Sequence, residues 1–109
     1  MTQVVDMELA VKRAGGRRKL AAELHGMLLD STRDLKRLIE SSWASQDLDA
    51  LFVHVHKLNG STRYCGVPEL EAQCETLETQ IKRGAADLQT NYDGLILAID
   101  RILDLNIEF

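Results

Sequence analysis

Apolar residues recur every three or four positions along most of the chain, which is the spacing of an α-helix that buries one face. Residues 17–44 carry the longest such stripe. Its apolar members are Leu20, Leu24, Met27, Leu28, Leu35, Leu38 and Ile39. The tetrad Ser-Thr-Arg-Asp at residues 31–34 interrupts the stripe and resembles a capping box. The pattern therefore allows either one long helix or two shorter segments here.

Three more amphipathic helices follow. The first is expected to begin at Asp47, a residue type that caps helices, and to end near Gly66 in a left-handed conformation. Pro68 suits the first turn of the second, which Gly84 should end. The third is predicted over residues 85–106. The inner residues are expected to be Leu48, Leu51, Phe52, Val55 and Leu58 in the first, Leu70, Cys74, Leu77 and Ile81 in the second, and Leu88, Leu95, Ile99, Ile102 and Leu103 in the third.

A short helix is predicted ahead of these, from a cap at Asp6 to about Ala14, where Gly15 and Gly16 make a natural stop. Amphipathic helices joined by short turns pack as an antiparallel bundle. We therefore expect an all-α fold, an antiparallel four-helix bundle with a short extra N-terminal helix. With 109 residues, the chain should form a single domain over residues 1–109.

Composition and charge exclude several kinds of function. The formal net charge is −4, and there is no basic stripe of the kind that duplex DNA requires. The dense basic run at residues 12–13 and 17–19 is interpreted as a solvated corner. No apolar run is long enough to span a membrane, and no signal peptide is evident. Cys65 and Cys74 lack disulfide or zinc spacing and suit reduced thiols in the cytoplasm.

The candidate chemistry lies at residues 56–62, His-Lys-Leu-Asn-Gly-Ser-Thr. Residues four apart lie on one face of a helix, so Gly60 should sit beside His56. A glycine within a helix costs about 1 kcal/mol relative to alanine. Clearance would explain that cost, since the backbone of another protein could then approach the imidazole. On a helical wheel His56 lies at the boundary with solvent, Lys57 points outward and Asn59 turns toward the core.

The other histidines are weaker candidates. His54 has Ala50 and Leu58 as its four-residue neighbours, and His25 has no comparable gap of small residues beside it. A metal site of His54, His56 and Cys65 is disfavoured, because two histidines two apart on a helix point to different sides. No metal site is therefore predicted.

These residues resemble a known family. His56, Leu58, Gly60, Ser61, Thr62 and Gly66, with Leu77 and Glu78 on the next helix, are similar to the signature of histidine-containing phosphotransfer (HPt) domains. The further run Tyr64-x-Gly66-Val67-Pro68, followed by Cys74, resembles the C-terminal HPt domain of BarA/GacS-type hybrid sensor histidine kinases. The resemblance covers almost the whole chain.

The resemblance implies a two-component phosphorelay. His56 would accept a phosphoryl group from the aspartate of one receiver domain and pass it to another, with no ATP site and so no enzyme activity of its own. It implies no cofactor in this domain, Mg²⁺ in the partner receiver, and receivers of a hybrid kinase or a response regulator as partners. We also expect a monomer in the cytoplasm without direct membrane contact. The BarA/GacS resemblance would make it the cytoplasmic C-terminal part of a membrane-bound sensor kinase. The alternative is a helical adaptor that binds signalling partners without phosphate chemistry.

Six residues around the acceptor are expected to shape the site and contact the partner: Lys57, Asn59, Gly60, Ser61, Arg63 and Tyr64. Many HPt domains place a lysine three residues after the histidine, where this chain has Asn59. Lys57 is then the lysine close to the site, and neutralisation of the phosphate would depend on it or on Arg63.

Overall fold

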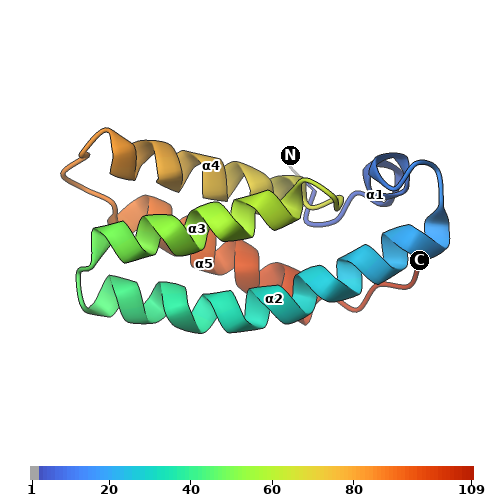
Figure 1. The fold of residues 1–109 in the computed structure, drawn as a ribbon, viewed down its shortest axis with the longest axis horizontal. Coiled ribbons are helices and arrows are strands. Elements are labelled where there is room, and N and C mark those ends of the chain that lie inside the picture. The colour runs from blue at the N-terminus through green and yellow to red at the C-terminus, as the bar shows by residue number, and fades with distance from the viewer. Residues whose placement is uncertain (1–2) are drawn as a thin grey trace.

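The computed structural model describes residues 3–109, and within that range the chain folds into five α-helices without a β-strand (Figure 1). They are α1 (Met7–Arg13), α2 (Arg18–Ala44), α3 (Leu48–Thr62), α4 (Pro68–Lys82) and α5 (Gln89–Asp104). The predicted all-α fold with a short N-terminal helix is confirmed.

Helices α2 to α5 form the bundle, and each packs on two of the others. Helix α3 lies between α2 and α4, with α5 behind them, while α1 packs on α2 beyond the end of the four-helix body (Figure 1). Their buried faces share one core, which includes Ile39, Leu51, Leu58, Leu77 and Ile99. The molecule is accordingly elongated, with extents of 42 × 24 × 20 Å.

Helix α2 is one continuous helix, which settles the choice that the pattern left open. Thr32 does not cap a second segment but is fully buried in the middle of the helix. The buried positions alternate in steps of four and three, and several are small or polar: Ala21, His25, Leu28, Thr32, Leu35, Ile39 and Ser42. A stripe drawn through apolar residues alone misses this face. Met27 and Leu38, predicted inside, are therefore 65% and 47% exposed.

Helix α3 begins as predicted, because the Oδ1 of Asp47 accepts the backbone N–H of Ala50 at 3.1 Å. It ends at Thr62, earlier than the expected stop near Gly66. The positive-φ glycines are Gly15, Gly16 and Gly84, so the prediction of a left-handed Gly66 is wrong. A side chain at Gly66 would instead clash with the backbone before and within α1, its Cβ lying 2.7 Å from the N of Ala10.

Two other boundaries differ in detail. Leu48, predicted inside, is 39% exposed, because it is the first residue of α3 and lies at the end of the bundle. Helix α5 begins at Gln89 and not at residue 85. The Oδ1 of Asp87 accepts the N–H of Gln89 at 3.0 Å, a local turn contact just ahead of the helix.

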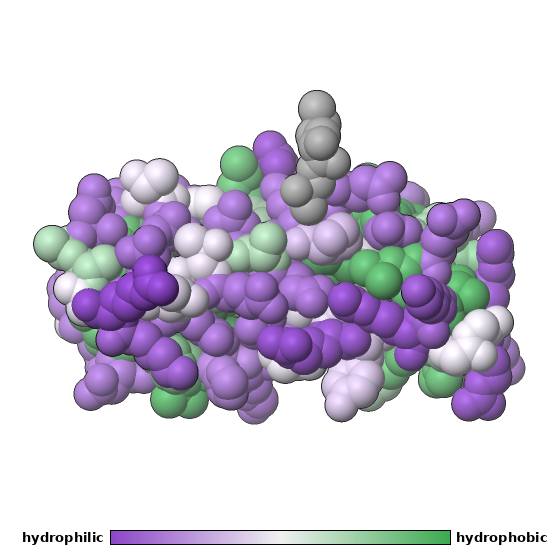
Figure 2. Space-filling model, turned by 90° about the horizontal axis from the view of Figure 1, so that it is seen from above, coloured by the Kyte–Doolittle hydropathy of each residue, from purple (hydrophilic) through white to green (hydrophobic). Residues whose placement is uncertain are grey.

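The outer surface is mainly polar. Figure 2, which views the molecule from above, shows hydrophilic residues over most of that face, with apolar side chains more frequent toward the end where α1 lies. Among residues 3–109, no helix combines the length and the hydrophobicity that crossing a bilayer requires.

Candidate functional site

His56 stands on the outer face of α3 with its side chain 71% exposed. Its Nδ1 lies 3.2 Å from the Oε1 of Glu78 on α4. Its ring lies almost parallel to that of Phe52, one turn earlier, with 5.8 Å between centroids and 9° between planes. The imidazole is therefore held at one nitrogen and along one face, while the rest of the ring faces solvent.

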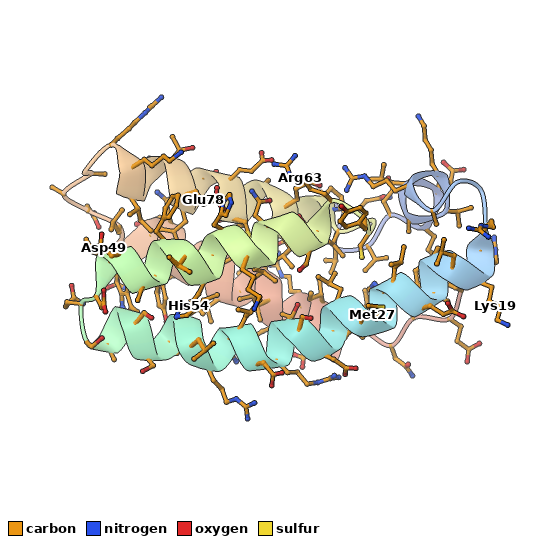
Figure 3. All side chains as sticks on the ribbon, viewed as in Figure 1. Lys19, Met27, Asp49, His54, Arg63 and Glu78 are labelled. Carbon is orange, nitrogen blue, oxygen red and sulfur yellow. The ribbon has the colours of Figure 1, made fainter. Side chains whose placement is uncertain are left out.

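Glu78 determines which nitrogen is available. Its side chain is 16% exposed and faces α3 from the neighbouring helix (Figure 3). A carboxylate oxygen accepts hydrogen bonds, so this contact is satisfied when Nδ1 carries a proton. In the neutral ring the lone pair then belongs to Nε2, the nitrogen on the far side from Glu78. Sequence reasoning placed Glu78 in a signature but gave it no chemical role.

Gly60 follows His56 by one turn and is exposed. A Cβ built on Gly60 would meet no atom of the described chain within 4 Å. Packing within this chain therefore does not demand a glycine at position 60. The missing side chain leaves open space on the outer surface of α3 beside His56, where a partner protein can approach the ring.

A groove between α2 and α3 lies next to this face, with a volume of about 280 Å³. Helix α2 lines it with Leu24, Met27, Leu28 and Ser31, and the α3 side contributes Lys57, Gly60, Ser61, Tyr64 and Cys65. Met27 and Tyr64 are 65% and 64% exposed, so large nonpolar surface at the groove is open to solvent. The structure thus brings Lys57, Gly60, Ser61 and Tyr64 together in one surface.

The remaining predicted site residues lie elsewhere. Asn59 is 4% exposed, on the core side of α3 as the helical wheel predicted, so its side chain adds no surface to this face. The hydroxyl of Thr62 donates to the backbone O of Asn59 at 2.6 Å, which satisfies a carbonyl inside the last turn of α3. Arg63 is exposed on the α4 side (Figure 3), where its Nη2 lies 3.5 Å from the Oε1 of Glu75.

The other histidines are placed differently from His56. His54 is half-buried on the side of α3 that faces α2, away from Glu78 (Figure 3). His25 is buried on α2, with its ring 5.4 Å from that of Phe109, and burial lowers its pKa. Neither offers an exposed nitrogen comparable to that of His56.

The two cysteines do not form a reactive centre. Both are free and buried. Burial raises the pKa of Cys65 to about 11 and that of Cys74 further still, so both are neutral thiols near pH 7. Among the residues that the structure describes, no three His, Cys, Asp or Glu side chains gather as metal ligands.

Comparisons with known proteins identify the family that this chain resembles. The model of a protein family described as Hpt domain matches residues 23–105 of the chain. The sensor histidine kinase GacS of Pseudomonas protegens is 40% identical over 100 residues, which is 92% of this chain and 11% of that protein. The signal transduction histidine-protein kinase BarA of Escherichia coli K12 is 31% identical over 100 residues, 90% of this chain and 11% of the kinase.

The fold of a solved structure is similar to this chain over most of its length. The crystal structure of an HPT domain from a Shewanella sensor hybrid histidine kinase aligns with a TM-score of 0.86 and 27% identity, covering 92% of this chain and 87% of that one. The chain spans about 11% of the length of the curated relatives that it matches.

Proposed function

Since the chain belongs to the Hpt domain family and so to the histidine phosphotransfer modules of phosphorelays, we propose that His56 is its phosphoacceptor. It would take the phosphoryl group from a receiver aspartate and pass it to another receiver aspartate. The observation that carries this proposal is the His56–Glu78 contact at 3.2 Å on a side chain that is 71% exposed. An exposed imidazole whose inner nitrogen is engaged presents its outer nitrogen as a nucleophile.

The transfer step follows from that arrangement. The Nε2 lone pair attacks the phosphorus of the receiver's aspartyl phosphate, and the bond from phosphorus to the carboxyl oxygen breaks. The leaving carboxylate takes the electron pair. The proton stays on Nδ1, so the phosphorylated ring carries a positive charge that the carboxylate of Glu78 balances. The reverse sequence of bonds passes the group to the next aspartate.

This chain needs to supply little else. Phosphoryl transfer depends mainly on in-line positioning and on stabilisation of charge. In this proposal the receiver contributes its aspartate, its Mg²⁺ and its lysine, and Lys57 provides positive charge beside the acceptor. No cofactor is assigned to this domain, and no ATP site is part of the proposal.

The groove between α2 and α3 is the surface that we assign to the receiver. It adjoins His56 through Gly60 and offers the exposed side chains of Met27 and Tyr64. Open apolar surface of this kind, bordered by polar groups, is typical of docking sites on proteins. The parent kinase, the monomeric state and the cytoplasmic location remain predictions from the sequence.

The direct test is phosphoryl transfer from a phosphorylated receiver to this chain. His56→Gln should abolish labelling while the circular dichroism spectrum stays helical, because the exposed ring contributes little to packing. The matched control is His54→Gln, two residues away on the same helix, which should still be labelled. Acid-labile phosphate persisting on His56→Gln would refute the assignment. A wild-type chain that binds receivers without being labelled would favour the adaptor function.

A further inference from the structure

Helix α3, which carries His56, ends differently from the other helices of the described residues. In α1, α2, α4 and α5, the residue after the helix donates its backbone N–H to a carbonyl of the last turn. Among the hydrogen bonds described for residues 3–109, the corresponding residue of α3, Arg63, makes no such bond. The last carbonyls of a helix need partners. At this end the O of Asn59 accepts the hydroxyl of Thr62 at 2.6 Å, and the O of Thr62 accepts the N–H of Cys65 at 3.1 Å.

Arg13, the last residue of α1, adds a side-chain donor from outside the bundle. Its Nη1 donates to the backbone O of Thr62 at 3.1 Å and to that of Cys65 at 2.8 Å. The same nitrogen lies 3.0 Å from the Oε1 of Glu71 on α4, and both charged side chains are largely buried, 27% and 16% exposed. The interpretation of the basic run at residues 12–13 and 17–19 as a solvated corner is therefore wrong for Arg13. One guanidinium joins α1 to the end of α3 and the start of α4.

Backbone contacts hold the same junction. The N–H of Asp6 donates to the O of Gly66 at 2.8 Å, and the N–H of Glu69 donates to the O of Gln3 at 3.3 Å. Gly66 permits this approach, because any side chain there would clash with the backbone of residues 6 and 10. The N-terminal segment thus docks on the α3–α4 turn, although it lies outside the matched family region of residues 23–105.

This junction lies next to the surface assigned to the receiver. Gly60, Ser61 and Tyr64, which line the groove, belong to the last turn of α3 and the residues just after it. We propose that Arg13 is a positioning residue, which completes the closure of α3 at Thr62 and Cys65 from outside the bundle and so fixes the receiver-docking groove. His56 lies well before this turn, so Arg13 acts on docking and not on the chemical step. The inference rests on the proposed function.

The test compares four proteins in single-turnover transfer from a phosphorylated receiver at increasing receiver concentration: wild type, Arg13→Gln, Arg13→Lys and Lys12→Gln. The control, Lys12→Gln, removes the same charge from the adjacent residue, which is exposed and has no ion pair in the described structure. Thermal unfolding checks that each variant is folded at the assay temperature. Amide hydrogen exchange of residues 62–65 reports on the end of α3.

Arg13→Gln should raise the half-saturating receiver concentration about tenfold, because small misplacements of a docking surface are costly. Its maximal rate should stay within about twofold of wild type. Arg13→Lys should fall between the two, because an ammonium keeps the pairing with Glu71 but lacks the planar fork of donors. Amides 62–65 should exchange faster in Arg13→Gln, and Lys12→Gln should behave as wild type.

Wild-type half-saturation in a folded Arg13 variant would overturn the inference. An equal effect in Lys12→Gln would do the same, since it would indicate general charge steering. If Arg13→Gln is unfolded, the milder Arg13→Lys decides by the same criteria. If the wild-type chain takes no phosphoryl group, the proposed function fails, and unchanged exchange at residues 62–65 would separately contradict the closure by Arg13.

Discussion

At the scale of single residues, the proposed chemistry depends on the pair formed by His56 and Glu78. The two side chains come from different helices, and their contact joins Nδ1 to a carboxylate oxygen at 3.2 Å. Phe52 supports the ring from one face. With its inner nitrogen and one face occupied, the imidazole has one orientation in which Nε2 points outward. Orientation of this kind is what an in-line transfer requires.

Glu78→Gln tests the charge in this pair. The amide oxygen of glutamine can still accept the proton of Nδ1, but it cannot balance the positive charge of the phosphorylated ring. We expect the transfer equilibrium to shift toward the receiver by roughly tenfold, the scale of a lost charge-assisted hydrogen bond. The measurement is the ratio of labelled receiver to labelled chain at equilibrium.

The control is Glu75→Gln, which removes another carboxylate of α4. The Oε1 of Glu75 lies 3.5 Å from the Nη2 of Arg63 and is not the partner of His56. It should leave the equilibrium ratio unchanged. A shift of the same size in both variants would mean that general charge, and not the contact with Nδ1, balances the ring.

The sequence indicated His56 as the candidate acceptor but did not indicate its contact with Glu78. The signal for His56 was local, since Gly60 and Lys57 lie within one turn of it. Glu78 lies 22 residues further along, and the packing of α3 against α4 decides that it meets Nδ1. Arg13 was missed for the same reason, because its contacts with Thr62 and Cys65 join residues 49 and 52 positions apart.

At the scale of elements, α3 carries a glycine that nothing within the chain requires. A Cβ at Gly60 would meet no atom within 4 Å, so Gly60→Leu should fold. It should raise the free energy of unfolding by up to about 1 kcal/mol, because leucine is the better helix former. Transfer should fall by about 100-fold or more, since the new side chain would occupy the approach to His56.

Gly26→Leu is the matched control. Gly26 is also an exposed glycine within a helix, and its Cβ would likewise meet nothing within 4 Å. This variant should gain similar stability and keep wild-type transfer. Denaturant unfolding and single-turnover transfer measure both quantities. Wild-type transfer by a folded Gly60→Leu chain would remove the clearance argument.

Element boundaries were predictable where the cause was local. Asp6 and Asp47 accept the backbone N–H groups expected of helix caps, Pro68 opens α4, and Gly84 adopts the left-handed conformation that ends it. Gly66 was misinterpreted, because its need for a glycine arises from the approach of α1 and not from its own φ angle. The burial of Thr32 likewise depends on neighbouring helices, which hydropathy alone does not reveal.

At the scale of the whole molecule, a second packing cluster joins the C-terminal residue to α1 and α2. It includes Ala10, Ala21 and Phe109. His25 contacts the ring of Phe109 and is 6% exposed, and its Nδ1 has no hydrogen-bond partner in the described structure. A charged imidazole is costly in such a place.

The stability of the fold should therefore depend on pH through His25. Burial lowers its pKa from the ordinary 6.5, so the unfolded chain binds the proton more readily than the folded chain. Well above pH 6.5 both states are neutral at this residue, and it has no effect. As the pH falls through 6.5, the unfolded chain is protonated first, and the free energy of unfolding decreases until the pH lies below the lowered pKa.

His25→Met should flatten this part of the profile, because methionine fills a similar space and does not titrate. The measurement is denaturant unfolding at a series of pH values from about 7.5 to 5. His54→Gln, on the half-buried side of α3, provides the comparison. An unchanged slope in His25→Met would show that the loss of stability arises at other groups.

The most direct measurement of the central claim is the position of the phosphoryl group on the chain. After transfer from a phosphorylated receiver to the isotopically labelled protein, nuclear magnetic resonance of the imidazole nitrogens identifies both the residue and the nitrogen that bears phosphorus. We expect the group on Nε2 of His56, with Nδ1 still protonated against Glu78. Phosphorus on His54, or on Nδ1 of His56, would contradict the account.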